Sequence, residues 1–123
     1  MSNITIYTDR LMSYWDRNLF GFPHQGYTHA AILNSAVCGD EVEFRLIVSA
    51  SGLEVVDVWA RGCCVSECCA AMLAELVRGK PLAWLDTFSD ADWDRYVNIP
   101  VSESREQSCM MLPLYCLRKA LTN

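Results

Sequence analysis

Residues 53–80, LEVVDVWARGCCVSECCAAMLAELVRGK, change their hydrophobic period halfway along. Leu53, Val55 and, with some slippage, Val58 and Ala60 follow a period of two, which is typical of a β-strand. The apolar residues that follow recur at intervals of three and four, as they do on one face of a helix; they are Val65, Cys68, Cys69, Met72, Leu73, Leu76 and Val77. Gly79 supplies a C-terminal cap. The stretch predicts a strand that passes directly into a helix.

The segment before this stretch predicts a partner for the strand. Val42, Phe44, Leu46 and Val48 alternate with Glu41, Glu43 and Arg45. Ser51-Gly52 is a turn signal between the two alternating runs. The two runs therefore predict a β-hairpin, and a short third strand is expected over residues 28–33.

Three further segments predict helices. Residues 4–18 place Ile4, Tyr7, Leu11, Tyr14 and Trp15 at helical spacing, and Gly21 and Pro23 close that segment. Ser89, followed by Asp90 and Asp92, reads as a capped helix start. Residues 104–121 repeat the apolar stripe, with a capping box expected between Ser104 and Gln107. Together the patterns predict a hairpin, a third strand and several helices in one domain over residues 1–123.

Composition narrows the class of protein. No apolar run approaches the length of a membrane span, and the N-terminus lacks the layout of a signal peptide, so we expect a cytoplasmic protein without membrane contact. The net charge of −5 argues against nucleic acid as a partner. Seven cysteines, an odd number in a chain expected in the cytosol, indicate metal binding, sulfur chemistry or buried thiols rather than a disulfide scaffold.

The cysteines divide by position. Cys68, Cys69 and Cys116 lie on apolar helix faces, where free cysteine packs as a small hydrophobe. Cys63 ends a strand and precedes a helix, where unpaired N–H groups and the helix dipole favour a thiolate suited to bind metal or carry sulfur. The pattern leaves Cys64 undecided between packing and chemistry.

A set of four residues should meet at one edge of the sheet. Cys38 and Asp40 precede the first strand of the hairpin and Cys63 follows the second, so the hairpin brings them together. Cys109, near the start of the last helix, could close the set. Three thiolates and a carboxylate are suitable ligands for zinc or an iron–sulfur cluster.

Pro113 and the two histidines bear on this site. Pro113 would unpair the carbonyl of Cys109, and either a kink that presents the Cys109 thiol or a loosely wound first turn fits the sequence. His24 is expected to be a solvated loop residue, and His29 is only a weak candidate for a metal ligand.

The chain resembles the NifU/IscU-type iron–sulfur cluster assembly scaffolds, including the SufU branch. The resemblance rests on four blocks in the same order: YTDRLMSYWDRNLFG, CGDEVEFRL, GCCVSECCAAMLAELVRGK and CMMLPLYCLRKAL. It implies an α+β fold, in which a short antiparallel sheet of about three strands packs against helices. It also implies a metal site at Cys38, Asp40, Cys63 and Cys109. It also implies that small residues usually stand where this chain has Cys64, Cys68 and Cys69.

This chain departs from both branches of the family. Ser108 stands where IscU proteins have a histidine, and their chaperone-binding segment is reduced to residues 99–101. The SufU branch lacks that histidine too, but it carries an insertion between the second and third cysteines that is missing here. SufU proteins also have an arginine three residues before the third cysteine, whereas Arg105 lies four residues before Cys109.

Three functions follow from the resemblance and its departures. The first is a scaffold, not itself an enzyme, that receives sulfur from a cysteine desulfurase, with Cys109 as persulfide acceptor, and passes a cluster, expected to be [2Fe-2S], to recipient apoproteins. The second is a zinc-dependent sulfurtransferase, and the third is a binding module with structural zinc. Asp40, as a hard ligand, would favour release of a cluster. Cysteines near a surface edge would also allow a transient homodimer.

Overall fold

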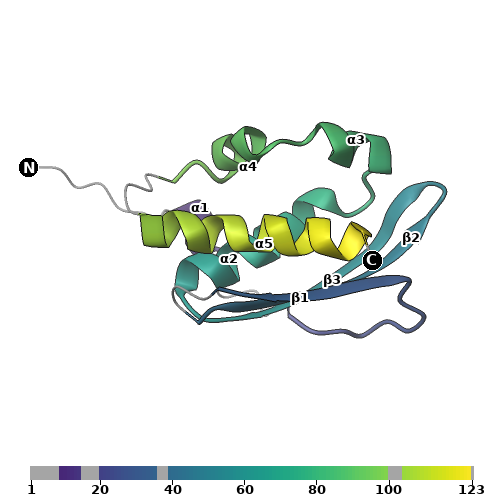
Figure 1. Ribbon diagram of the computed structural model, residues 1–123, viewed down its shortest axis with the longest axis horizontal. Coiled ribbons are helices and arrows are strands. Elements are labelled where there is room, and N and C mark those ends of the chain that lie inside the picture. Colours follow the sequence, from purple (N-terminus) through teal and green to yellow (C-terminus); the bar gives the residue numbers. More distant parts are fainter. Residues whose placement is uncertain (1–8, 15–19, 36–38, 100–103, 123) are drawn as a thin grey trace, which may run out of the picture.

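The change of period at residues 61–64 is the point where the sheet ends and the central helix begins. The computed structural model describes residues 9–14, 20–35, 39–99 and 104–122 (Figure 1). The described elements are α1 (Asp9–Met12), β1 (His29–Asn34), β2 (Glu41–Ser49), β3 (Gly52–Arg61), α2 (Cys64–Val77), α3 (Leu82–Thr87), α4 (Asp90–Val97) and α5 (Ser104–Thr122). The predicted α+β class and the three-stranded antiparallel sheet are confirmed.

The sheet runs in the order β1-β2-β3, with each neighbouring pair antiparallel. In β2 the predicted alternation holds, because Val42, Phe44 and Leu46 are fully buried. In β3 one residue differs from the prediction. Val55 was expected to face the core, but it is only half-buried, and its neighbour Val56 is buried instead. The cause is a bulge: Ile47 pairs with Val55 but Val48 pairs with Leu53, so β3 holds one extra residue at this point.

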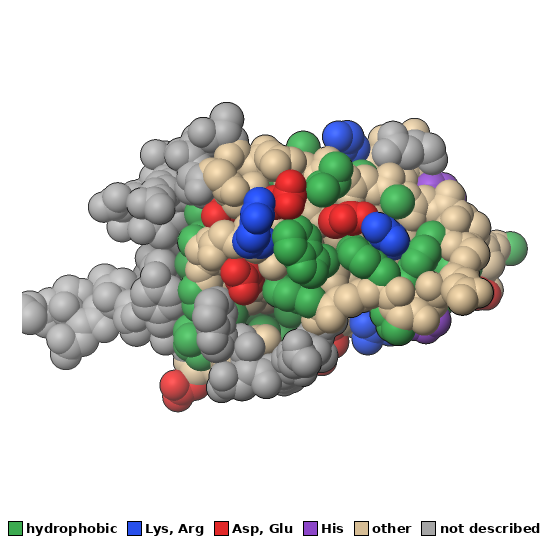
Figure 2. All heavy atoms as spheres, turned by 90° about the horizontal axis from the view of Figure 1, so that it is seen from below, with side chains coloured by type: hydrophobic (Ala, Val, Ile, Leu, Met, Phe, Trp, Pro, Cys, Tyr) green, Lys and Arg blue, Asp and Glu red, His purple; other side chains and the backbone are tan. Residues whose placement is uncertain are grey.

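Helices α2 and α5 cover one face of the sheet, and α3 and α4 lie beyond them on the side away from the strands (Figure 1). Figure 2 shows the underside, where acidic, basic and apolar side chains are interspersed. One face of the antiparallel sheet is therefore packed and the other is solvated, which explains the alternating sequence of β2. None of the described helices combines the length and apolar character that crossing a membrane requires.

Helix α2 is buried more completely than one stripe predicts. Ala71 and Ala74, expected to lie off the stripe, are buried, as are Ser66 and Ala70. The helix packs against β3, α5 and α1, so three sides of it are covered. Gly79 follows the C-cap residue Arg78 with φ +83, the left-handed conformation expected of a residue that ends a helix.

The remaining helices differ in part from the predictions. Of the helix expected over residues 4–18, the described part holds one turn that ends at Met12, and residues 1–8 and 15–19 lie outside the described residues. Helix α3 was not predicted, because its six residues are too few to show a period. The capped start at Ser89 is confirmed, while the capping box expected at Ser104 involves side chains outside the described part.

Candidate metal centre

The site begins at the corner where β3 passes into α2. Cys63 is the N-cap residue of α2, with extended backbone (φ −72, ψ 158), and its Sγ accepts a hydrogen bond from the Ser66 N–H at 3.4 Å. This confirms the predicted place of Cys63 at a helix N-terminus. The Cys63 sulfur thus takes the place of the side-chain oxygen that usually caps a helix.

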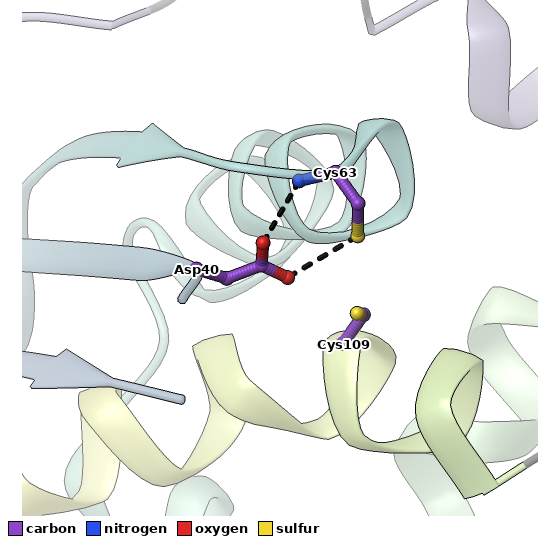
Figure 3. A group of neighbouring side chains, drawn as sticks. All are labelled: Asp40, Cys63 and Cys109. Carbon is purple, nitrogen blue, oxygen red and sulfur yellow. Dashed lines mark hydrogen bonds between the residues drawn. The ribbon is translucent and has the colours of Figure 1, made fainter. Parts of the chain in front are cut away.

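Asp40 reaches this corner from the turn before β2 and is 1% exposed. Its Oδ1 accepts from the Cys63 N–H at 2.9 Å, and its Oδ2 accepts from the Cys63 thiol at 3.2 Å (Figure 3). The Ser66 hydroxyl also donates to Oδ2, at 2.6 Å. One carboxylate oxygen is thus tied to the backbone, and the other faces the sulfur of Cys63.

Gly62 makes the close approach of Asp40 feasible. A Cβ at this position would stand 2.0 Å from Asp40 Oδ1 and 2.5 Å from its carboxyl carbon. The backbone of Gly62 also has φ +145, which residues with a Cβ rarely adopt. A glycine is therefore required here both by conformation and by space.

Cys109 comes to the site from the second turn of α5 and is 1% exposed. One ligand atom from each of Asp40, Cys63 and Cys109 lies within 4.8 Å of the other two (Figure 3). Ligands about 2.3 Å from one tetrahedral ion stand about 3.8 Å apart, so modest side-chain rotations would let the three atoms share an ion. Among the described residues, this is the only group of three or more His, Cys, Asp or Glu side chains with that proximity.

Ser66 connects the two sides of the site. Its hydroxyl lies 3.2 Å from the carbonyl oxygen of Cys109 as well as 2.6 Å from Asp40. Pro113, inside α5, has no N–H to offer the carbonyl four residues earlier, which is that of Cys109. The Ser66 hydroxyl of α2 lies within hydrogen-bond distance of this carbonyl. Ser66 was not predicted as a site residue, although it stands three residues after Cys63 in the block GCCVSECCAAMLAELVRGK.

Cys38 belongs to residues 36–38, which lie outside the described residues. Its membership of the site therefore stays a prediction. Gly39 and Asp40 are described, and the Ser35 N–H donates to the carbonyl of Asp40 at 2.8 Å, which closes the turn at its base.

The other described cysteines do not belong to this group of ligands. Cys68, Cys69 and Cys116 are buried as predicted, and burial raises the pKa of Cys68 to about 12 and that of Cys116 to about 11. The Cys116 thiol donates to the carbonyl of Val42 at 3.2 Å. Cys64, which the sequence left undecided, is half-buried with its sulfur 3.7 Å from those of Met12 and Cys68.

Neither His24 nor His29 belongs to the group of possible metal ligands found among the described residues. His24 lies in a loop as predicted, but it is not simply solvated, because its Nδ1 lies 2.7 Å from Asp57 Oδ2. The Tyr27 hydroxyl donates to the same oxygen at 2.6 Å, so the loop is fastened to β3. His29 lies on β1 and contacts the Thr28 hydroxyl at 2.8 Å.

Comparisons with known proteins agree with this fold. The NifU-like N terminal domain family matches residues 7–123. A candidate iron–sulfur cluster assembly scaffold for the SUF system from Fervidobacterium islandicum AW-1 superposes with TM-score 0.72 at 18% identity, over 94% of this chain and 96% of that one. A nitrogen-fixing NifU-like protein (N-terminal) from Brucella abortus gives TM-score 0.73 at 16% identity, over 95% and 92%. Among curated protein sequences, none matches significantly.

Proposed function

This chain belongs to the family of the NifU-like N-terminal domain, and on that premise we propose that it is a scaffold on which iron–sulfur clusters are assembled. The observation that carries the proposal is the convergence of Asp40, Cys63 and Cys109 within 4.8 Å. These three residues come from three separate elements and stand at the positions that the family's motifs assign to its ligands. Cys38, two residues before Asp40, would complete the set.

The donor set suits a cluster that is cargo rather than a permanent cofactor. Thiolates bind iron firmly, whereas a carboxylate oxygen is a harder ligand that soft metal centres hold less well. Asp40 Oδ2 also accepts a hydrogen bond from Ser66, and this bond competes with a metal for the same electron density. The site can therefore hold a cluster through its cysteines and release it at Asp40.

Sulfur would arrive as a persulfide on a cysteine desulfurase. A thiolate of the scaffold attacks the outer sulfur of that persulfide, a new sulfur–sulfur bond forms, and the desulfurase cysteine leaves as a thiolate. We propose Cys109 as the acceptor. Because Cys109 is 1% exposed, the docked desulfurase must uncover it, and contact near the start of α5 is the direct route. Apoproteins that need clusters would be the recipients.

A zinc-dependent sulfurtransferase is the second candidate. The feature that favours it is Ser108, which is half-buried next to Cys109 where IscU proteins place a histidine. The SufU branch of the family lacks that histidine too, and cysteine and carboxylate are among the usual ligands of zinc. Bound zinc would order the thiolates, and sulfur transfer would proceed at one of them. A structural zinc site without sulfur transfer is the third candidate.

The test is reconstitution without air. The protein is incubated with ferrous iron, cysteine, a cysteine desulfurase and a thiol reductant, which supplies the two electrons that convert each persulfide sulfur to sulfide. Iron, zinc and acid-labile sulfide are then measured per chain. A scaffold is expected to gain iron and sulfide in equal amounts, and to lose both in Cys38→Ser, Cys63→Ser and Cys109→Ser. Cys116→Ser is the matched control, because this buried cysteine contacts the backbone of β2 and β1 rather than the site.

The other outcomes separate the remaining candidates. Retained zinc with no sulfide-bearing cluster contradicts the scaffold. Mass spectrometry then decides between the two zinc functions: a persulfide on Cys109 indicates sulfur transfer, and its absence on every cysteine indicates a structural site.

A further inference from the structure

A second group of sulfur atoms lies beside the metal centre and shares no residue with it. Cys64 Sγ lies 3.7 Å from Met12 Sδ and 3.7 Å from Cys68 Sγ. Met12 ends α1, while Cys64 and Cys68 stand one turn apart on the first two turns of α2. We call Met12, Cys64 and Cys68 the sulfur triad. It joins a methionine and two cysteines from segments more than fifty positions apart in the chain.

The spacing suits a shared ion. Two sulfurs bound at about 2.3 Å to one ion at the tetrahedral angle stand about 3.8 Å apart. Both contacts of Cys64 are already at 3.7 Å, so its sulfur needs little movement to share an ion with each neighbour. The helix provides the cysteine pair, because residues four apart lie one above the other on the same face.

The triad is also accessible from outside. Cys64 and Met12 are half-buried, whereas Cys68 is 1% exposed. An ion would enter past Cys64 and Met12 and meet Cys68 at the inner end. A metal has to displace the protons of both thiols to bind. Metals with strong affinity for sulfur do so, and the protons leave to water.

The chemistry of the donors selects the ion. Thioether sulfur is not among the usual ligands of zinc, which takes cysteine, histidine and carboxylate groups. Thiolate and thioether together are the ligands that select Cu(I). Within the described residues, no group of three His, Cys, Asp or Glu side chains includes Cys64 or Cys68, so harder donors do not compete there. Nearby Glu67 is engaged, because its Oε2 accepts from the Gly62 N–H at 3.1 Å.

From this geometry we propose that Met12, Cys64 and Cys68 form a binding site for a soft monovalent metal ion, Cu(I), separate from the Asp40–Cys63–Cys109 centre. The bound ion would join α1 to the first turns of α2. It would thereby fasten α1 against the helix whose N-cap is Cys63. The site requires a cysteine at each of positions 64 and 68. It does not depend on the proposed scaffold function.

The test titrates Cu(I) under argon, with a non-thiol reductant and a chromophoric Cu(I) chelator as competitor. The protein carries Cys38→Ser, Cys63→Ser and Cys109→Ser, which removes the thiols of the first centre while serine still caps α2. One Cu(I) per chain is expected to remain bound. Cys64→Ala and Cys68→Ala should each lower the affinity at least about a hundredfold, and Met12→Leu about tenfold.

Cys69→Ala in the same background is the matched control. Cys69 is buried next to Cys68 in α2 but is not in the triad, so its removal should leave the affinity unchanged. Circular dichroism checks that each variant is folded. The same Met12→Leu comparison is made in the otherwise unaltered chain with zinc preloaded at the first centre, in case the triple variant does not fold.

Hydrogen exchange gives an independent readout. Cu(I) is expected to slow exchange in residues 9–14 of the triple variant, and the Met12→Leu chain should lose that protection. Absence of tight Cu(I) binding would overturn the site, as would equal affinity in Cys64→Ala. An affinity that Met12→Leu leaves unchanged would remove the methionine from the site and with it the proposed link between α1 and α2.

Discussion

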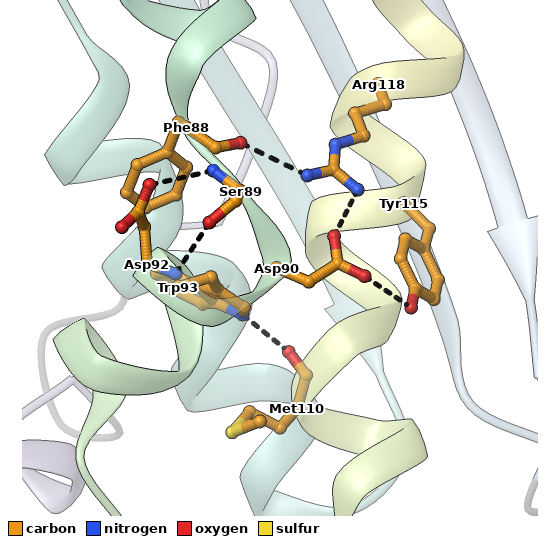
Figure 4. A network of polar contacts seen from close by, with 8 residues as sticks. All are labelled: Phe88, Ser89, Asp90, Asp92, Trp93, Met110, Tyr115 and Arg118. Atoms are coloured by element: carbon orange, nitrogen blue, oxygen red, sulfur yellow. Dashed lines mark hydrogen bonds and ion pairs between the residues drawn. The ribbon is translucent and has the colours of Figure 1, made fainter.

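Helices α2 and α4 begin in different ways, although both follow a residue with extended backbone. At α4 the cap is reciprocal: the Ser89 hydroxyl accepts from the Asp92 N–H at 3.1 Å, and Asp92 accepts from the Ser89 N–H at 2.9 Å (Figure 4). The Ser89 N–H holds the pKa of Asp92 below its usual value. Every group of this cap comes from four consecutive residues, so the local sequence alone specifies it.

At α2 the cap is a thiol, and its support comes from elsewhere in the chain. Cys63 Sγ accepts from Ser66 at a long 3.4 Å, and cysteine is not among the favoured N-cap residues. The Cys63 N–H is satisfied by Asp40, which lies 23 positions earlier and is buried. The α4 cap thus stabilises a helix, whereas the α2 cap gives up stability to place a thiol and a carboxylate together. This is the pattern expected where function competes with local stability.

Gly62→Ala should disturb the start of α2 more than any of the other substitutions. The new Cβ would meet Asp40 Oδ1 at 2.0 Å and would strain a backbone with φ +145. Strain and overpacking together should lower the free energy of unfolding by more than about 3 kcal/mol. Metal loading should be lost as well. Chemical denaturation and metal analysis test this, with Gly79→Ala as a control, because a Cβ there meets nothing within 4 Å. Equal effects of the two variants would show that only backbone strain matters.

Asp40→Ala tests whether the carboxylate has a role beyond folding. It leaves the Cys63 N–H without its acceptor and should lower the free energy of unfolding by about 3 kcal/mol. A cluster held by the cysteines alone should then leave about tenfold more slowly. The readout is the rate of cluster transfer to an apoprotein.

Asp57→Ala is the matched control for Asp40→Ala. Asp57 is also a buried carboxylate on the hairpin, accepting from Tyr27 and lying 2.7 Å from His24, but it is not near the metal ligands. It should destabilise the fold and leave cluster release unchanged. If the Asp40→Ala protein releases its cluster as fast as the unaltered chain, Asp40 does not control release.

Ser66→Ala sharpens the comparison at the connection between α2 and α5. The substitution removes the Ser66 hydroxyl, which is the donor that faces both the carbonyl of Cys109 and the carboxylate of Asp40. We expect about 2 kcal/mol less stability and about a tenfold to hundredfold change in metal affinity. Isothermal titration with zinc measures the affinity. An unchanged affinity would reduce Ser66 to a packing residue.

Ser89→Ala should have the smallest effect and should mark the contrast between the two helix starts. Loss of the serine cap is expected to lower the free energy of unfolding by about 1 kcal/mol. Metal affinity should not change, because two other contacts still anchor α4 to α5. The Trp93 indole N–H donates to the carbonyl of Met110 at 2.9 Å, and Asp90 forms an ion pair with Arg118 (Figure 4). A change in metal affinity would show that α4 positions Cys109 after all.

Sequence patterns predicted those parts of the molecule whose causes lie close together in the chain. Alternation in β2, the stripe of α2 and the capped helix start at Ser89 each depend on neighbouring residues, so their period or spacing reveals them. The hairpin then carried the prediction further, because antiparallel pairing brings Asp40 and Cys63 to one edge of the sheet.

Other features were settled by contacts between distant segments. The bulge that turns Val56 inward, the bond between Ser66 and the Cys109 carbonyl, and the approach of Met12 to Cys64 all join residues that no period relates. The clearest case is a pair of adjacent cysteines. The sequence determined that Cys63 and Cys64 stand where a strand meets a helix. Only the tertiary structure decided that Cys63 faces the carboxylate of Asp40 while Cys64 faces Met12 and Cys68, because successive helix residues point about 100° apart and meet different neighbours.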